Sequence, residues 1–533
     1  MICLFESWVE LRAAVDVLAG ADAKVAERAV QVASGLRPLA RCADPEALAA
    51  GRAPVAPAAA AAVQAVREML SQVRAEDAAG RFARGLGLAR DAVIAAERTG
   101  HGPTRAAALL HRGRMEDSAA DFAAAERSLE DAYWLAEASG DDGTRAEAAL
   151  RLLRLVGEPR GRDHDAMQWA RQAEAVILRL GEPAALEAAL RANLGVVHNR
   201  FGRYDAALAA LHRAIALERR PGHPLLAVYH RDLGNVHYRR GRYRDAEVAY
   251  ALAVAIGEAA LGREHPDVAR SVSNLGEAHR VQGHSSAAER CFLRSIAIWE
   301  DAFGLDHPLL APPLNGLGIL AFRRGDMKAA AAHFERVRDL FERSYGPQHP
   351  DVGAVTGNLG EVLLRQGELA ASQRASERAL KILEAALGPE HDSLADVHSN
   401  LARALALQGQ PEAAARHYAR AVTLLERAHG PGFPELTKPL TGQGLLALAD
   451  GRPAQAVALL ERALTLGGTH DPGEFAELRL ALARALWDSH GDRVRGRDLA
   501  ELAAAELAAP GPSPVHAPLA AALERWLAEH PRG

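Results

Sequence analysis

Apolar residues recur every three to four positions along most of this chain, which is the spacing of one face of an α-helix. Between His223 and Pro434 the whole pattern of apolar and polar positions repeats with a period of 42 residues. Three copies begin HPLLAVYHRDLGNVHYRRG, HPDVARSVSNLGEAHRVQG and HPLLAPPLNGLGILAFRRG, and two more copies follow. A fixed period of this length predicts a solenoid of stacked helical units rather than a domain with one large core.

Small residues keep the same register in each copy and predict that every unit is a helical hairpin. Glycine inside a helix costs roughly 1 kcal/mol relative to alanine, so its recurrence needs a packing reason. The first set is Gly195, Gly234, Gly276, Gly318 and Gly360, with Ala402 and Gly444 in register. A second set follows twelve residues later: Ala207, Ala246, Ala288, Ala330, Ser372, Ala414 and Ala456. Both sets would let the second helix of a hairpin press closely onto the first.

Two further sets of glycines predict where the helices end. Between the two helices lie Gly202, Gly241, Gly283, Gly325, Gly367, Gly409 and Gly451, which suit a short turn with positive φ. After the second helix come Gly262, Gly304, Gly346, Gly388 and Gly430. A His-Pro pair or a variant follows three residues later, and proline at that place favours a helix start.

With these positions the repeats resemble tetratricopeptide repeats in their 42-residue form, as found in kinesin light chains. The fold class predicted is all-α, a right-handed α-solenoid of such hairpins with an N-terminal helical cap. The resemblance implies a groove that holds peptide segments.

The same patterns predict how the chain is divided. The N-terminal cap has helices at residues 4–19 and 22–36. The predicted segments are 1–50 (cap), 51–60 (Pro/Ala linker), 61–185 (divergent hairpins at about 61–99, 104–138 and 144–180), 186–434 (regular array), 435–508 (C-terminal hairpins) and 509–533 (Pro-rich break and closing helix).

Three stretches resemble the C-terminal regions of large bacterial Hanks-type serine/threonine protein kinases. They are CLFESWVELRAAVDVLAGADAKVAERAVQVASGLRPLARCADPEAL, AYWLAEASGDD and ELRLALARALWDSHGDRVRGRDLAELA. In that family a kinase domain, and commonly a membrane helix, precede such a region, and neither is expected here. The resemblance implies a regulatory or scaffolding module, cytoplasmic, or extracytoplasmic if it is a fragment of a membrane-anchored kinase.

Composition excludes several other classes. The formal net charge of −5 argues against general affinity for nucleic acid, which needs a clustered basic surface. No run of 18 apolar residues is present, so no membrane insertion is expected, and the N-terminus does not read as a signal peptide. Arginine supplies all but four of the 63 basic residues, which is typical of a GC-rich bacterial genome.

The string His230-Arg231-Asp232-Leu233 spells the HRDL of a kinase catalytic loop, in which the aspartate is the base. The fifth residue after the aspartate should then be an asparagine that holds magnesium, but it is His237. No glycine-rich loop precedes the string and no DFG follows it. Because it also falls in phase with the repeat, we expect no catalytic residue, no enzyme activity and no cofactor.

Histidines and cysteines predict no metal site. His198, His237 and His279 share one register position, and residues one repeat apart lie too far from each other to ligate one ion. Asp163, His164 and Asp165 are expected to form a solvated turn without a distant partner. Of the three cysteines, Cys3 and Cys42 could be brought together by the cap helices, so either a redox-dependent bridge or two buried thiols stay open, and Cys291 is left over.

Function is therefore expected to reside on a surface. In the first helix of each hairpin, the positions two before and five after the in-helix glycine fall on the side away from the second helix. Asparagine there can pair with an extended peptide backbone, and arginine can bind carboxylates with two hydrogen bonds. The predicted groove residues are Asn193, Arg200, Asn235, Arg239, Asn274, Arg280, Arg323, Asn358, Arg365 and Asn400.

A second interpretation of the arginines is that they offset the helix dipole in the last turn and keep the array in solution. The function predicted is a non-catalytic scaffold that binds a protein or peptide, and an acidic segment is one of the ligands left open. The alternatives are the sensory arm of a kinase system and a structural homo-oligomer.

Overall fold

The computed structural model describes residues 2–20, 29–34, 36, 55–79, 81–119, 121–158, 160–218, 220, 222–467, 472–508 and 516–531. All regular elements among them are helices, and no strand occurs in these ranges. Contacts within the chain divide it into two units, Met1–Leu305 and Asp306–Gly533. The sequence pattern continues through this division and does not predict it.

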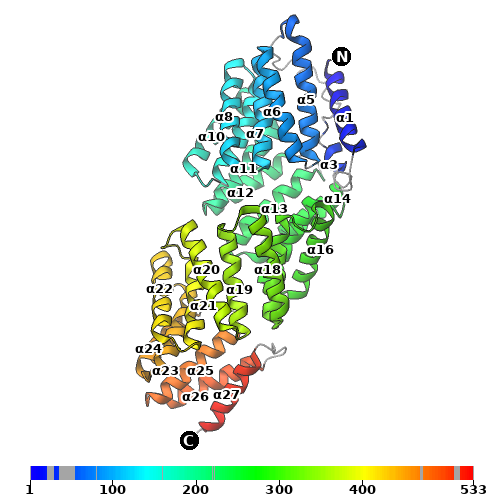
Figure 1. Cartoon of the computed structure of the whole chain (residues 1–533). Helices are drawn as coiled ribbons and strands as arrows, with labels where there is room; N and C mark the ends of the chain where they lie inside the picture. The colour runs from blue at the N-terminus through cyan, green and yellow to red at the C-terminus, as the bar shows by residue number, and fades with distance from the viewer. Residues whose placement is uncertain are drawn as a thin grey trace. The chain divides into compact units, whose positions relative to one another are not determined.

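In its described residues, the first unit has a short N-terminal element pair and six hairpins of adjacent helices. Its helices are α1 (Ile2–Ala19), α3 (Ala29–Ser34), the 3₁₀ helix η2 (Pro57–Ala59), α5 (Ala60–Ala78), α6 (Phe82–Thr99), α7 (Gly102–Ser118), α8 (Phe122–Ser139), α9 (Asp142–Gly157), α10 (Asp163–Arg179), α11 (Ala184–Arg200), α12 (Tyr204–Leu217), α13 (Pro224–Arg239), α14 (Tyr243–Leu261), α15 (Pro266–Val281) and α16 (Ser285–Phe303). The hairpins are the consecutive pairs from α5/α6 to α15/α16, as Figure 1 shows.

The second unit consists of five hairpins and a closing helix. Its helices are η3 (Pro308–Leu310), α17 (Ala311–Arg324), α18 (Met327–Tyr345), α19 (Pro350–Arg365), α20 (Leu369–Leu387), α21 (Leu394–Leu407), α22 (Pro411–His429), η4 (Pro434–Leu436), α23 (Thr437–Ala449), α24 (Pro453–Leu466), α25 (Pro472–Asp488), α26 (Arg493–Leu507) and α27 (Ala517–Glu529). The all-α solenoid of hairpins predicted from the repeat is confirmed by this arrangement.

The in-helix glycines lie where the two helices of a hairpin touch. A Cβ built on Gly276 would stand 2.8 Å from Cε1 of Phe292, and one on Gly318 would stand 2.7 Å from Cε1 of Phe334. In both hairpins the opposing ring comes sixteen residues after the glycine, and Gly195 meets Leu211 at the same spacing. The glycine therefore makes room for a large buried side chain at that position, while the small residue twelve positions on is buried beside it.

The turns also follow the predicted glycines. Gly241, between α13 and α14, has φ of +76°, and Gly262, after α14, has φ of +94°. Side chains with a Cβ rarely adopt this region, which is why glycine recurs there.

A histidine caps the first helix of several hairpins, which the sequence pattern did not predict. The Nδ1 atom of His265 accepts a hydrogen bond from the backbone N–H of Asp267 at 3.1 Å, ahead of Pro266. The equivalent residues His223, His307 and His349 accept in the same way. The recurring His-Pro therefore combines a side-chain cap with a proline at the first helical position.

The first helices of neighbouring hairpins contact one another, and this defines the face on which a site can lie. In the first unit α5, α7, α9, α11, α13 and α15 form such a series, and in the second unit α19, α21, α23 and α25 do. Among the described residues no pair of neighbouring second helices reaches comparable contact. Helices on the inner side of a curved stack come closest together, so the first helices line the inner side within each unit.

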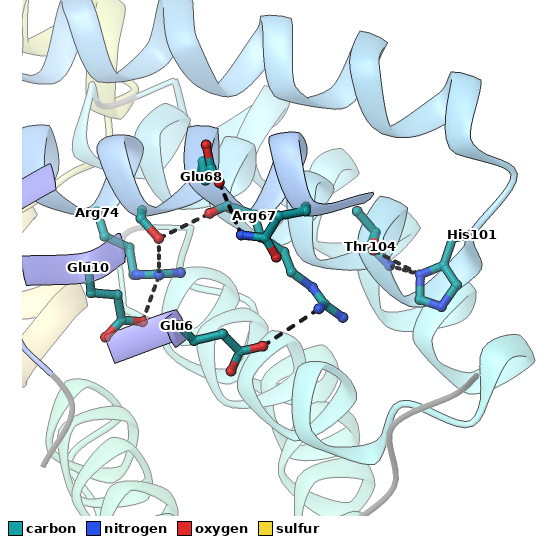
Figure 2. Close-up of polar contacts among 9 residues, drawn as sticks. Glu6, Glu10, Arg67, Glu68, Arg74, His101 and Thr104 are labelled. Atoms are coloured by element: carbon teal, nitrogen blue, oxygen red, sulfur yellow. Dashed lines mark hydrogen bonds and ion pairs between the residues drawn. The ribbon is translucent and has the colours of Figure 1, made fainter. Parts of the chain in front are cut away.

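Helix α1 is held against α5 by two arginines of α5 and by Arg81, which directly precedes α6. Arg74 donates to Glu10 at 2.8 Å, Arg67 lies 3.6 Å from Glu6, and Arg81 donates to the carbonyl of Gly20 at 2.8 Å. Figure 2 shows the carboxylates of Glu6 and Glu10 directed toward Arg67 and Arg74. Arg67 and Arg74, seven residues apart, lie on one stripe of α5, and together with Arg81 they fix the register of the N-terminal helix.

Most predicted helices match the structure closely. The expected helix 4–19 is α1, the closing helix predicted from Pro518 to His530 is α27, and the three divergent hairpins are α5/α6, α7/α8 and α9/α10. Of the second cap helix, 22–36, residues 21–28 lie outside the described part, and α3 covers its end. The domain boundaries themselves stay a prediction.

Candidate partner-binding face

We use the term first-helix face for the predicted polar residues of the first helices together with the polar residues of first helices that interact with them or lie near them. In the first unit it comprises Asn193, Arg200, Asn235, Tyr238, Arg239, Arg270, Asn274, Glu277 and Arg280. In the second unit it comprises Asn315, Arg323, Asn358, Glu361, Arg365, Arg403 and Lys438. Each unit is described by itself.

Asn235 is the centre of a hydrogen-bond network in the first unit. Its Oδ1 atom accepts from Nδ2 of Asn274 on α15 at 3.1 Å and from the hydroxyl of Tyr250 on α14 at 2.9 Å. Burial raises the pKa of Tyr250, which keeps its hydroxyl a donor at all ordinary pH values. The two asparagines that the pattern assigned to a ligand thus bind each other and fix their helices in register.

Glu277 is the second centre of this face. The hydroxyl of Tyr238 on α13 donates to its Oε1 atom at 2.8 Å, and Arg280 donates to both of its oxygens at 2.6 and 2.7 Å. The hydrogen bond with Glu277 raises the pKa of Arg280. Arg280 is therefore neutralised within the chain, and its charge is directed at Glu277 instead of at solvent.

Two predicted arginines of the first unit are exposed. Arg200 and Arg239 end α11 and α13, and neither makes an ion pair with any residue that the structure describes. Asn193, about two turns before Arg200, donates from Nδ2 to the carbonyl of Leu150 on α9 at 2.9 Å. The arginines are thus the predicted residues whose donors point to solvent, whereas the asparagine links two first helices.

A further pair of arginines was missed by the sequence pattern. Arg270 on α15 is exposed, yet burial by surrounding protein lowers the pKa of its guanidinium, and the nearby charge of Arg231 lowers that pKa further. Arg231 is 9% exposed and its Nη2 atom lies 3.4 Å from Oδ1 of its neighbour Asp232. Like charges in close range favour an anion between them.

In the second unit the predicted residues separate into exposed and buried ones. Arg323, Asn358 and Arg365 are exposed. Asn358 donates to Asn315 at 3.4 Å, and the guanidinium of Arg365 lies 5.6 Å from the ring centre of Phe322. Asn400 is only 4% exposed, because its position on α21 is covered by neighbouring helices, so it offers no surface to a partner and is left out of the face.

Lys438 and Arg403 form ion pairs across the second unit that sequence spacing gave no reason to expect. Burial acts to lower the pKa of Lys438, but the carboxylates of Glu361 and Asp396, 3.8 and 3.9 Å away, outweigh it and raise that pKa. Arg403 binds both oxygens of Glu477, at 2.5 and 3.0 Å, from 74 residues away in the sequence. These pairs tie first helices together and leave little free charge at this end of the face.

The HRDL string has the environment that the repeat predicts. Asp232 is 6% exposed and faces Arg231, so a substrate hydroxyl has no access to its carboxylate. His230 is half-buried and burial lowers its pKa. Packing between first helices accounts for the string.

One expectation about the loop clusters was wrong. Asp163 is bound by Nη1 and Nη2 of Arg203 at 2.5 and 2.6 Å, and Arg203 also donates to Nδ1 of His198 at 2.9 Å. Asp163 therefore has a distant partner and begins α10 rather than a solvated turn. The proposed pairing of Cys3 with Cys42 lies outside the described side chains, and Cys291 is a half-buried thiol whose pKa burial raises.

Helix α1 carries an exposed apolar stripe on the side away from α5. Leu4, Trp8, Leu11 and Val15 are 55%, 52%, 48% and 52% exposed and follow one another at spacings of four, three and four residues. No helix in the described part of the chain is both long and apolar enough to span a lipid bilayer.

The sequence profile of the tetratricopeptide repeat matches residues 185–259, 225–301, 273–343, 309–385, 351–427 and 393–467, which together cover more than half of the chain. No curated protein matches. The structure of apo RapI is 12% identical and covers 72% of this chain and 98% of its own, with a TM-score of 0.50, and it shares the fold.

Two other solved structures are similar at lower TM-scores. BtubC (BKLC) from P. vanneervenii is 21% identical over 42% of this chain and 91% of its own, with a TM-score of 0.38. The nearly identical TPR-like repeats of a Podosopora anserina protein described as a kinesin light chain are 21% identical over 39% of this chain and 98% of their own, with a TM-score of 0.34. None of these matches bears on the resemblance to bacterial kinase C-terminal regions, which stays a prediction.

Proposed function

Because this chain belongs to the tetratricopeptide-repeat proteins, we propose that it is a non-catalytic scaffold that binds a segment of a partner protein on its first-helix face. The observation that carries the proposal is that the first unit has exposed arginines on first helices whose register is fixed by hydrogen bonds. Arg200 and Arg239 have no ion-pair partner among the described residues. Hydrogen bonds of Asn235 and Glu277 join α13, which carries Arg239, to α15. A ligand would meet arginines carried on helices whose register is already fixed, so the backbone needs no rearrangement on binding.

The charges favour a segment that contains aspartate or glutamate. Arginine binds carboxylates with two parallel hydrogen bonds. Arg200, Arg239 and Arg270 are all exposed on first helices of one unit, and the pKa of Arg270 is lowered first by burial and then by the charge of Arg231. An acidic segment would relieve this repulsion, associate faster at low salt and lose affinity when salt screens the charges over about 10 Å.

The test is capture of a partner from an extract of the native cell, with the affinity then measured for the captured protein. Reversing two charges in the first unit, Arg200→Glu with Arg239→Glu, should weaken binding by about 2–5 kcal/mol. The corresponding pair in the second unit, Arg323→Glu with Arg365→Glu, shows which unit holds the segment.

A matched control separates this face from the net charge of the chain. Arg171 on α10 and Arg244 on α14 are exposed arginines of second helices in the first unit. Arg171→Glu with Arg244→Glu changes the net charge by the same amount and should leave binding unchanged. Equal losses in the control and in both face variants would contradict the proposal, as would no loss in any variant that melts like the wild type.

A second candidate function is self-association through α1. Spacings of four and three residues are those at which two helices interlock side chains, so the stripe of Leu4, Trp8, Leu11 and Val15 suits the α1 helix of a second copy. Sedimentation at two concentrations should then show a dimer that Trp8→Glu with Leu11→Glu converts to monomer. A monomer at both concentrations for the wild type would exclude this candidate and leave the partner-binding proposal intact.

A further inference from the structure

Three potential metal ligands come together where the second and third regular hairpins meet. Glu247 on α14, His279 on α15 and His284 before α16 each offer one ligand atom, and these atoms all lie within 4.8 Å of one another. Oε1 of Glu247 is 3.8 Å from Nδ1 of His279, and the two imidazole rings are 5.8 Å apart. The three residues come from two consecutive hairpins, so an argument restricted to histidines one repeat apart could not find them.

Nδ1 of His279 is the atom that needs a partner. It is buried from solvent and has no hydrogen bond, although its ring lies next to a carboxylate. A buried imidazole nitrogen without a partner costs free energy unless a proton or a metal ion fills the gap.

The equivalent histidine two hairpins earlier shows which group of the chain can bind the Nδ1 atom at this position. There His198 stands for His279 and Arg203 stands for His284 in the repeat register. The guanidinium of Arg203 donates to Nδ1 of His198 and at the same time binds Asp163 on the preceding second helix. A cation therefore lies between the histidine and the carboxylate of the previous hairpin.

In the third hairpin this built-in cation is missing because the arginine is replaced by His284. The carboxylate is still present, and Glu247 is held by a hydrogen bond of 2.7 Å from Nε2 of Gln282 to its second oxygen, which leaves Oε1 directed at His279. His284 is exposed and free to rotate toward the pair. The site thus has a carboxylate, Glu247, and an imidazole, His279. In place of the arginine of the earlier hairpin it has a further potential metal ligand, His284.

We propose that Glu247, His279 and His284 bind one divalent transition-metal ion, with Zn²⁺ as the best match, and that the ion joins α14 to the hairpin α15/α16. Two imidazoles and a carboxylate are a ligand set that Zn²⁺ accepts, with water as the fourth ligand. Zinc–ligand bonds of about 2.0–2.1 Å in a tetrahedron place ligand atoms roughly 3.3 Å apart. The present spacing closes to that value with small side-chain rotations.

The consequence is a local clamp between two neighbouring repeats. The arginine of the earlier hairpin makes its link at all times, whereas a zinc link forms only when the ion is present. Since stability in a repeat array depends on interfaces between nearest neighbours, zinc should stabilise the α14–α15 junction.

The experiment is a titration of the tag-free full chain, freed of metal with a chelator, with Zn²⁺ followed by calorimetry and with Co²⁺ followed by visible absorption. The wild type should bind one ion with an affinity that drops at least tenfold in His279→Ala, His284→Ala and Glu247→Gln. The Co²⁺ complex should absorb as a four-coordinate species. Zinc should raise the melting temperature of the wild type and of none of these three variants.

His237→Ala is the matched control. His237 occupies the same register one repeat earlier, and its Nδ1 atom is likewise buried without a hydrogen bond, but Arg242 stands where His284 does. This variant should bind zinc like the wild type. Zinc binding that Glu247→Gln and His284→Ala leave unchanged, or no binding by the folded wild type at 100 micromolar zinc, would overturn the proposal. Glu247→Gln preserves shape and His284 is exposed, so a loss in these variants does not reflect unfolding.

Discussion

The packing reason for the recurring glycine can be tested by adding one carbon atom, the Cβ of alanine, at Gly276. Gly276→Ala adds a Cβ that would stand 2.8 and 2.9 Å from Cε1 and Cδ1 of Phe292, and 3.0 Å from Cβ of Cys291. Real Cβ atoms do not approach carbon this closely. The ring of Phe292 is 1% exposed, so it is enclosed and the helices must move apart for the methyl group to fit.

Two opposing terms set the size of the effect. Replacing glycine by alanine in a helix gains roughly 1 kcal/mol from backbone entropy. Overpacking a closed contact costs about 1–3 kcal/mol. The net destabilisation is expected to be on the order of 1 kcal/mol for Gly276→Ala and about 1–3 kcal/mol for Gly276→Leu, which adds bulk at the same contact.

Gly87 on α6 provides the control, because a Cβ there meets no atom within 4 Å. Gly87→Ala keeps the entropy gain without the clash and should stabilise the chain by up to about 1 kcal/mol. Thermal and urea unfolding of both variants measure the difference. If Gly276→Ala unfolds at or above the wild type, the glycine does not make room for Phe292 and the proposed reason for its recurrence is wrong. Amide exchange should also show that the damage spreads to the adjacent hairpins.

Two further predictions concern acid and catalysis. Burial first, and then the charges of His417 and Arg420, lower the pKa of His398 to about 4, while an unfolded histidine titrates near 6.5. The unfolded chain therefore takes up the proton first as the pH falls, so unfolding free energy should decline between about pH 6.5 and pH 4, by at most on the order of 3 kcal/mol, and His398→Gln should flatten that slope. Purified chain should neither bind ATP at micromolar concentration nor transfer phosphate, and Asp232→Ala should change nothing; autophosphorylation that disappears in this variant would restore the catalytic interpretation of the HRDL string.

Much of the fold could be predicted from the sequence because each repeat specifies its own hairpin. Gly241 and Gly262 need a positive φ, and Gly276 needs a contact without a side chain, so their register fixes helix ends and facing surfaces. Local rules of this kind apply to each copy independently. The ring that opposes the glycine comes sixteen residues later, a detail that depends on how the two helices cross and that spacing alone does not give.

The candidate face was predicted less completely, because it depends on which helices meet. Spacing placed Asn235 and Asn274 on one side of their helices, but the hydrogen bond between them depends on the distance between α13 and α15. Asn400 follows the same spacing and is nevertheless buried, which the spacing within one helix does not reveal.

The ion pairs between first helices also depend on which helices meet. The pairing of Arg403 with Glu477 joins residues far apart in the sequence and has no local signature. For the cluster of Glu247, His279 and His284, one signal was present in the sequence: His284 stands where the equivalent position of an earlier repeat holds Arg203.

The central claim is that the partner lies on the first-helix face, and site-specific photo-crosslinking tests it most directly. Val228 on α13 occupies the same register as Arg270 on the neighbouring first helix, whereas Val248 on α14 is 69% exposed on a second helix. A benzophenone amino acid replaces residue 228 in one variant and residue 248 in a second variant. Each variant is mixed with the captured partner and irradiated. The account predicts a crosslinked product from residue 228 and none from residue 248. Crosslinking from residue 248 alone would place the partner on the second helices and contradict the account.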